Sequence, residues 1–164
     1  QIALDKWLAL YPNSLVMQSD IKFQEEYDSL SNYESGKRKG KLTKRDSTSW
    51  QDKSWIVGVE VSGGTKAYDW NQLQKKRIIN DMIGYLPISV VLASDNKSFA
   101  ALRRATPGQK LILKNDSLYD GGGCVYNLLG KSHKSGVPDL VKVTAYQEYW
   151  HSWQTFHPDT KQFK

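Results

Sequence analysis

Short apolar runs separated by turn-forming residues occupy the middle of the chain and restrict the folds that it can adopt. The run at 54–61 alternates in polarity, reaches Gly63-Gly64 and resumes at 65–68, a pattern typical of a β-hairpin. Six more candidate strands follow, separated by Gly, Pro, Asp and Asn, at 77–79, 88–93, 98–103, 110–114, 124–129 and 140–143. We therefore expect a mainly β (α+β) fold, with an antiparallel sheet or partly open barrel and short helices at the ends.

Both ends of the chain carry a copy of one aromatic-proline motif. The sequence WLALYPNS, which starts at Trp7, aligns without gaps with WQTFHPDT, which starts at Trp153. Before the second copy, apolar residues recur every three or four positions, which predicts an amphipathic helix over 145–156. Pro158 cannot continue that helix, and the Asp-Thr pair after it favours a turn. Each copy is therefore predicted to be a helix followed by a proline-terminated corner.

The repeat also suggests how the chain is divided. We expect residues 1–14 to be the tail of a preceding repeat unit in a tandem protein, and residues 15–164 to form one β-rich domain. A chain of 164 residues is long enough for one core. We further expect a short strand at 14–17 and a short helix at 70–76, with Asp69 as its N-cap.

The chain is basic, with a net charge of +6, and much of the excess lies in one stretch. That stretch contains Lys37, Arg38, Lys39, Lys41, Lys44 and Arg45. Such a cluster could contact a polyanion, but no aromatic side chains alternate with it for base stacking. A solvated basic loop is the favoured interpretation, polyanion binding is the alternative, and nucleic acid is not favoured as a partner.

Cysteine and hydropathy exclude two further classes of protein. Cys124 is the only cysteine, so an intrachain disulfide or a multi-cysteine metal site cannot form. No apolar run reaches the length of a membrane span, so we expect no transmembrane segment in this chain.

Several motifs occur in the order found in a prokaryotic family. The family pattern is roughly G-V-x-V-x-G-x-x-K-A-Y, V-V-N-D, P-V-V-V, an aromatic-W-x-x-W helix and H-P-D-T. In this chain the pattern corresponds to 58–61, 66–68, 78–81, 87–91, 149–153 and 157–160. Over about residues 1–164, the chain therefore resembles the domain-of-unknown-function family three-one-seven-nine.

The resemblance implies one reactive motif, C-P-L-C-G, directly after the P-V-V-V strand. Paired thiolates at this spacing could bind a soft metal or form a disulfide. The corresponding residues here are Ala93-Ser94-Asp95-Asn96-Lys97, which lack both thiols. We therefore expect no metal and no cofactor.

Two sets of residues remain as weak site candidates. Asp81, Asp95 and His157 could act as acids or bases if the fold placed two of them in one cleft. The aromatic residues Trp50, Trp70, Tyr126 and Trp150 could bind a glycan or peptide if they were exposed. A turn, cap or core role is the favoured interpretation for most residues in both sets.

The favoured hypothesis is a non-catalytic module of a bacterial cell-envelope or secreted protein. It would bind a partner subunit, the preceding domain of its parent chain, a glycan or a peptide, outside the cytoplasm. The alternative is an enzyme of unrecognised type that uses the Asp and His candidates.

Overall fold

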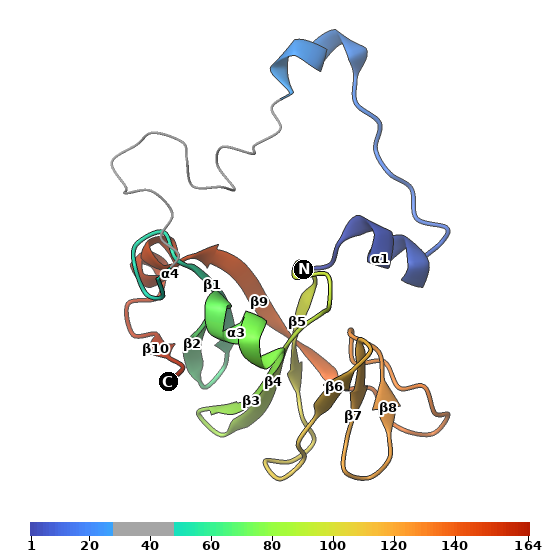
Figure 1. The fold of residues 1–164 in the computed structure, drawn as a ribbon, viewed down its shortest axis with the longest axis vertical. Coiled ribbons are helices and arrows are strands. Elements are labelled where there is room, and N and C mark those ends of the chain that lie inside the picture. The colour runs from blue at the N-terminus through green and yellow to red at the C-terminus, as the bar shows by residue number, and fades with distance from the viewer. Residues whose placement is uncertain (28–47) are drawn as a thin grey trace.

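The computed structural model describes residues 1–27 and 48–164 and contains two β-sheets. The larger sheet has seven strands in the order β10-β2-β1-β9-β5-β4-β3, and the smaller has the order β6-β7-β8 (Figure 1). The strands are β1 (Trp55–Val61), β2 (Gly64–Asp69), β3 (Ile78–Ile83), β4 (Leu86–Leu92), β5 (Phe99–Arg103), β6 (Ile112–Lys114), β7 (Ser117–Tyr119), β8 (Val125–Tyr126), β9 (Val141–Tyr149) and β10 (Lys161–Gln162).

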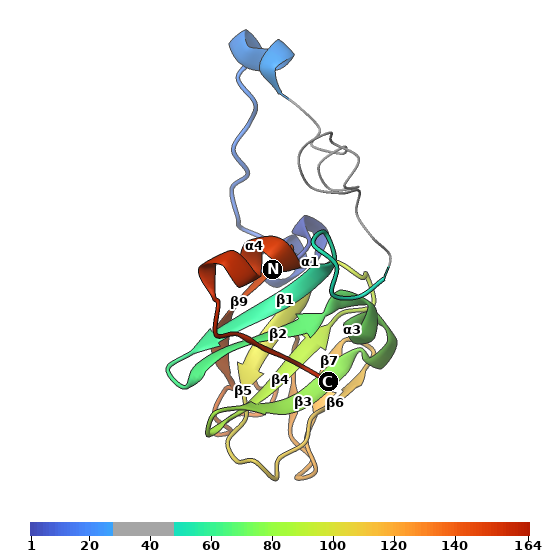
Figure 2. The same cartoon turned by 90° about the vertical axis from the view of Figure 1, so that its left-hand side faces the viewer.

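The seven-stranded sheet curls into a half-barrel, so the mainly β fold class is confirmed (Figure 2). Its pairs are antiparallel except for β10, which runs parallel to β2. Helix α3 (Trp70–Lys76) connects β2 to β3, and its predicted N-cap is confirmed because the Asp69 carboxylate accepts a hydrogen bond from Gln72 N.

The open seam of the half-barrel lies between β2 and β3. The turns at Gly63 and Gly84 meet there: Gly84 has a φ of +56°, and a Cβ on it would lie 3.1 Å from the carbonyl oxygen of Gly63. This close approach and backbone angle favour glycine at position 84.

The inner face of the half-barrel forms the largest apolar core. Val57 and Val59 of β1 point inward, as the two-residue period of a strand requires, and they pack with Tyr68, Trp70 and side chains of β3, β4 and β5. This cluster joins segments from most of the larger sheet into one buried unit.

Two further clusters cover the outer face. The small sheet packs through Leu118 and Tyr126 onto Val91 and Leu102 of β4 and β5. On the other side, helix α4 (Trp150–Phe156) places Trp153 against Ile56 of β1 and Ala67 of β2.

The structure corrects two predicted elements and adds one strand. The predicted helix over 145–156 is wrong in its first part, where β9 continues to Tyr149 because it forms a ladder with β1 from Glu60↔Thr144 to Trp55↔Tyr149. The predicted strand at 14–17 is wrong, since these residues have no strand partner within the described chain. Strand β7 at 117–119 was not among the predicted strands.

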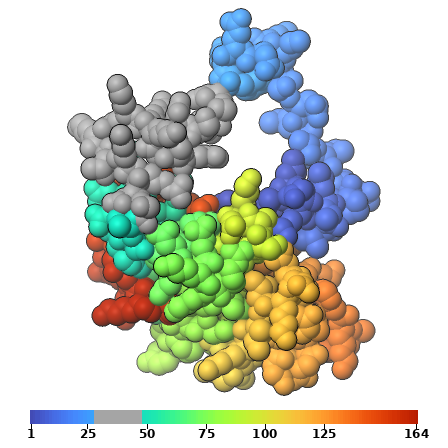
Figure 3. Space-filling view, viewed as in Figure 1, coloured from blue at the N-terminus to red at the C-terminus, as the bar shows by residue number. Residues whose placement is uncertain are grey.

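The N-terminal part of the chain lies outside the half-barrel. Residue Gln1 exchanges two backbone hydrogen bonds with Phe99, and helix α1 (Leu4–Leu10) follows. The chain then extends away from the body to the 3₁₀ helix η1 (Ile21–Glu26), as the blue region of Figure 3 shows.

Candidate functional site

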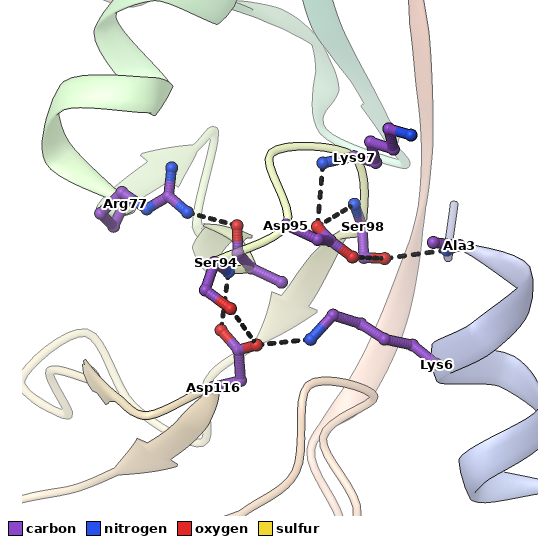
Figure 4. A network of polar contacts seen from close by, with 9 residues as sticks. Ala3, Lys6, Arg77, Ser94, Asp95, Lys97, Ser98 and Asp116 are labelled. Atoms are coloured by element: carbon purple, nitrogen blue, oxygen red, sulfur yellow. Dashed lines mark hydrogen bonds and ion pairs between the residues drawn. The ribbon is translucent and has the colours of Figure 1, made fainter.

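The β4–β5 loop lies where the resemblance would place paired cysteines, and it is held by hydrogen bonds. Asp95 Oδ1 accepts from the backbone nitrogens of Lys97 and Ser98 at 2.9 and 2.8 Å, and Oδ2 accepts from Ser98 Oγ at 2.6 Å (Figure 4). Partial burial acts to raise the pKa of Asp95, but the hydrogen bonds outweigh it, so the pKa lies below its ordinary value. The carboxylate therefore serves to shape the loop.

Asp116 joins the same loop to α1. Its Oδ1 accepts from Ser94 N at 2.8 Å, and its Oδ2 accepts from Ser94 Oγ at 2.7 Å and pairs with Lys6 Nζ at 2.5 Å. Burial acts to raise the pKa of Asp116, yet the bonds from Lys6 and Ser94 leave it below its ordinary value. The arrangement anchors the first turn of α1 to the body.

These residues do not fit the metal or redox chemistry that the family motif would support. Both thiols are replaced, both Asp95 oxygens already accept hydrogen bonds, and Lys6 places an ammonium next to Asp116. Within residues 1–27 and 48–164, no group of three or more His, Cys, Asp or Glu side chains could hold a metal ion.

A second polar cluster lies at the β2–β3 seam. Asp81 Oδ2 pairs with Lys66 Nζ at 2.6 Å and accepts from the Tyr68 hydroxyl at 3.0 Å. Burial, with the nearby Asp81 charge, raises the pKa of Tyr68, so its phenol stays protonated as a donor. The aromatic ring of Phe163 stacks on Tyr68 at a centroid distance of 5.4 Å. The cluster links β2 to β3 across the seam.

The three acid and base candidates have separate partners in the structure. Asp81 contacts β2 across the seam, whereas Asp95 accepts hydrogen bonds from Lys97 and Ser98 of its own loop. His157 follows α4, where its ring centroid lies 3.8 Å from that of Trp153. The structure therefore does not join any two of them by a hydrogen bond.

The aromatic candidates are packed rather than presented to solvent. Trp70, Tyr126 and Trp150 are buried. Trp70 packs on Phe99 inside the half-barrel, Tyr126 of β8 belongs to the cluster between the small sheet and the outer face, and Trp150 of α4 belongs to the cluster between α4 and β1. Trp50 is partly buried, with its ring centroid 5.1 Å from that of Trp150. These residues therefore lie mainly in the core, the interpretation that the sequence favours for most of them.

Tyr126 also belongs to a polar cluster under the glycine-rich loop. Burial, followed by the charges of Asp120 and Cys124, raises its pKa to about 12. Asp120 accepts from the backbone nitrogens of Gly122 and Cys124, both at 2.9 Å, which fixes the loop.

The basic residues Lys37, Arg38, Lys39, Lys41, Lys44 and Arg45 lie outside the described residues. In the part of the chain that the structure describes, no helix has the length and apolar character needed to cross a membrane.

The two aromatic-proline motifs adopt the same local structure. Trp7 Nε1 donates to Ser14 Oγ at 2.9 Å, and Trp153 Nε1 donates to Thr160 Oγ1 at 2.9 Å. Both helices have seven residues, and the residues after them, Tyr11 and His157, have (φ, ψ) of (−134°, 72°) and (−131°, 68°). The predicted helix and proline corner are therefore present in both copies.

The copies differ in what covers them. Trp153 is 0% exposed, and after its corner β10 pairs with β2 while Phe163 packs on the core. Trp7 is 40% exposed, and the residues that follow its corner include Leu15 at 99% and Met17 at 95%. We define the α1 surface as the exposed apolar residues Leu4, Trp7, Leu10, Tyr11, Leu15, Val16 and Met17.

The α1 surface is a candidate site that the residues chosen from the sequence did not include. Its signal was present in the apolar run 15–17 after the first proline corner, which was interpreted as a strand. A cavity of ≈ 360 Å³ adjoins this surface where β5 and β9 separate, and its lining includes Gln1, Trp7, Phe99, Lys142 and Ala145.

Comparison with known proteins identifies a family. No curated protein and no solved structure matches the chain. A family model described as "Protein of unknown function (DUF3179)" matches residues 1–160, nearly the whole chain. The resemblance expected from the ordered motifs is thereby confirmed, and the chain belongs to the DUF3179 family.

Proposed function

We propose that this chain is a non-catalytic, protein-binding module whose contact surface is the α1 surface. The observation that carries the proposal is the contrast between two corners of the same geometry, of which one has its tryptophan at 0% exposure and the other at 40%. Exposed apolar side chains gathered in one short segment, as here, are typical of a protein interaction site.

A protein partner is favoured over a glycan. The apolar residues of the surface include the aliphatic side chains Leu4, Leu10, Leu15, Val16 and Met17. Glycan sites rely instead on exposed aromatic rings flanked by polar groups, whereas Trp7 and Tyr11 are the aromatic minority of this surface. An enzymatic role has less support, because Asp81, Asp95 and His157 contact different parts of the fold. Location in the cell envelope or outside the cell stays part of the proposal.

Photocrosslinking in the cells that naturally make the protein tests this function. The photoreactive residue p-benzoylphenylalanine would replace Leu15, and the matched control would place it at Tyr85, which is 96% exposed in the β3–β4 turn. We expect a discrete adduct from position 15 and none from position 85. The absence of an adduct at position 15, or the same adducts from both positions, would contradict a specific protein contact there.

A further inference from the structure

The two corners have the same local structure but different surroundings, and the surroundings of the second corner indicate what the α1 surface binds. The motif repeats with an offset of 146 residues, so Leu15, Val16 and Met17 correspond to Lys161, Gln162 and Phe163. In the second copy those residues form β10 along β2 and insert an aromatic ring beside Tyr68. The first copy has the same corner but no such sheet within the described chain.

The tryptophans that open the two motifs show the same contrast. Trp153 lies flat against β1 at Gly58, where a Cβ would be 2.4 Å from the Trp153 ring. Trp153 is therefore received by a strand whose glycine leaves room for an indole. Trp7 presents an indole held in the same way, by its Nε1 bond to Ser14, and no strand of the described chain receives it in that manner.

Gln1 and Gln147 add an independent geometric observation. They are separated by 146 residues, which is the repeat offset, and Gln1 Nε2 donates to Gln147 Oε1 at 3.4 Å. Contact between equivalent residues of two repeats is the pattern expected at a local two-fold axis. Such an axis would pass between β9 and the start of the chain.

The strand pairing around this point agrees with a two-fold axis. On its β5 side, β9 is paired only at Val141, Val143 and the residue between them, within the chain that the structure describes. Beyond that ladder, β5 leaves β9, and Phe99 instead exchanges hydrogen bonds with Gln1. By symmetry, the edge of β9 near Gln147 would receive the β5-like strand of another unit.

We propose that the α1 surface is the closing corner of a second half-barrel of this same fold, located on the same polypeptide. This inference rests on the proposed function and names its partner. Trp7 packs over the glycine of a β1-like strand, Leu15 and Val16 extend a β2-like edge in parallel, and Met17 enters the seam where Phe163 enters in the present unit. The two units meet around the Gln1 and Gln147 pair.

The decisive experiment maps the adduct formed by a photoreactive residue at Met17. The full-length protein would carry p-benzoylphenylalanine in place of Met17 in its native cells, and mass spectrometry would identify the crosslinked peptide. We expect the adduct on a strand of the same polypeptide that carries a Lys-Ala-Tyr-like motif, next to its counterpart of Tyr68. An adduct on a protein of another fold, or on a second copy of the chain, overturns the inference while the adduct at position 15 still supports protein binding. Absence of adducts at both positions overturns both proposals.

A second measurement uses the purified chain and requires no knowledge of the partner. The triple variant Lys161→Leu, Gln162→Val, Phe163→Met places the 15–17 sequence in the β10 position. Its control is Lys161→Leu, Gln162→Val, Phe163→Ser. We expect the urea midpoint of the triple variant to stay near that of the unaltered chain, with a clear downward shift for the control. Equal downward shifts in both variants would show that Met17 cannot replace Phe163 in the seam, and would overturn the inference.

Discussion

The indole of Trp153 occupies the space that a side chain on Gly58 would need. A Cβ at Gly58 would lie 2.4 Å from two ring carbons, far inside contact distance, and Trp153 is completely buried. The packing of α4 on the half-barrel therefore depends on the absence of a side chain at one position in β1.

Replacing Gly58 with alanine is expected to displace α4. Overpacking of this kind typically costs about 1–3 kcal/mol, because the ring and the helix must both move. Urea unfolding followed by tryptophan fluorescence measures the loss. Gly121→Ala is the matched control, since a Cβ at Gly121 meets no atom within 4 Å. A Gly58→Ala variant as stable as the unaltered chain would refute this account of the packing.

The two corners provide a second prediction, because they share a hydrogen bond but differ in burial. Thr160→Val removes the acceptor of the fully buried Trp153 Nε1, and an unsatisfied buried donor costs about 1–3 kcal/mol. Ser14→Ala removes the equivalent acceptor from the exposed Trp7, where water can replace it, so the expected change is within about 0.5 kcal/mol. Denaturant midpoints of the two variants provide the comparison, and equal losses would show that burial does not distinguish the corners.

The elements that the sequence predicted best are those with local causes. The hairpin between β1 and β2 follows from alternation and Gly63-Gly64, and α3 follows from the ability of Asp69 to cap its first turn. The aromatic spacing in 145–156 satisfies a helix equally well, yet β9 runs to Tyr149 because its backbone pairs with β1, which is far away in sequence. The spacing of residues within 145–156 does not indicate this distant pairing partner.

The candidate site could likewise be predicted from the sequence only where its structure has local causes. The repeat predicted the two proline corners, and their hydrogen bonds are nearly identical. Their difference in burial depends on which sheet lies next to each corner, and no motif within the corner encodes it. The burial of Trp70 and Tyr126 was likewise decided by which face of the sheet other segments cover.

The seam between β2 and β3 is expected to depend on the Lys66 and Asp81 pair. Each side chain is less than one fifth exposed, at 17% and 16%, so removal of one partner leaves a poorly solvated charge. In a double-mutant cycle with Lys66→Met and Asp81→Asn, we expect a coupling free energy of about 0.5–3 kcal/mol. The control cycle pairs Lys66→Met with Asp139→Asn, because Asp139 instead accepts a hydrogen bond from Ser132 N. Coupling of the same size in both cycles would argue against a specific contact across the seam.

The anchoring of α1 is expected to weaken in acid. The pKa of Asp116 in the folded chain lies below its ordinary value of 3.8: burial acts to raise it, but bonds from Lys6 and Ser94 prevail. A lowered pKa means that the stabilisation is complete above the ordinary value and is lost as the pH falls through the folded value. Asp95 has a pKa lowered in the same direction, so the Asp116 contribution must be isolated by substitution.

The comparison of the unaltered chain with Asp116→Asn isolates that contribution. Hydrogen exchange of the α1 amides reports the local opening, measured at several pH values on both sides of 3.8 and corrected for the intrinsic exchange rate. The unaltered chain should protect α1 more than the variant near neutral pH, and this difference should shrink as the pH falls because protonated Asp116 no longer pairs with Lys6. Lys6→Met should likewise reduce the pH dependence, since it removes the ammonium from the same pair. A difference in protection that stays constant across the acid range would show that the Asp116 charge does not hold α1 to the half-barrel.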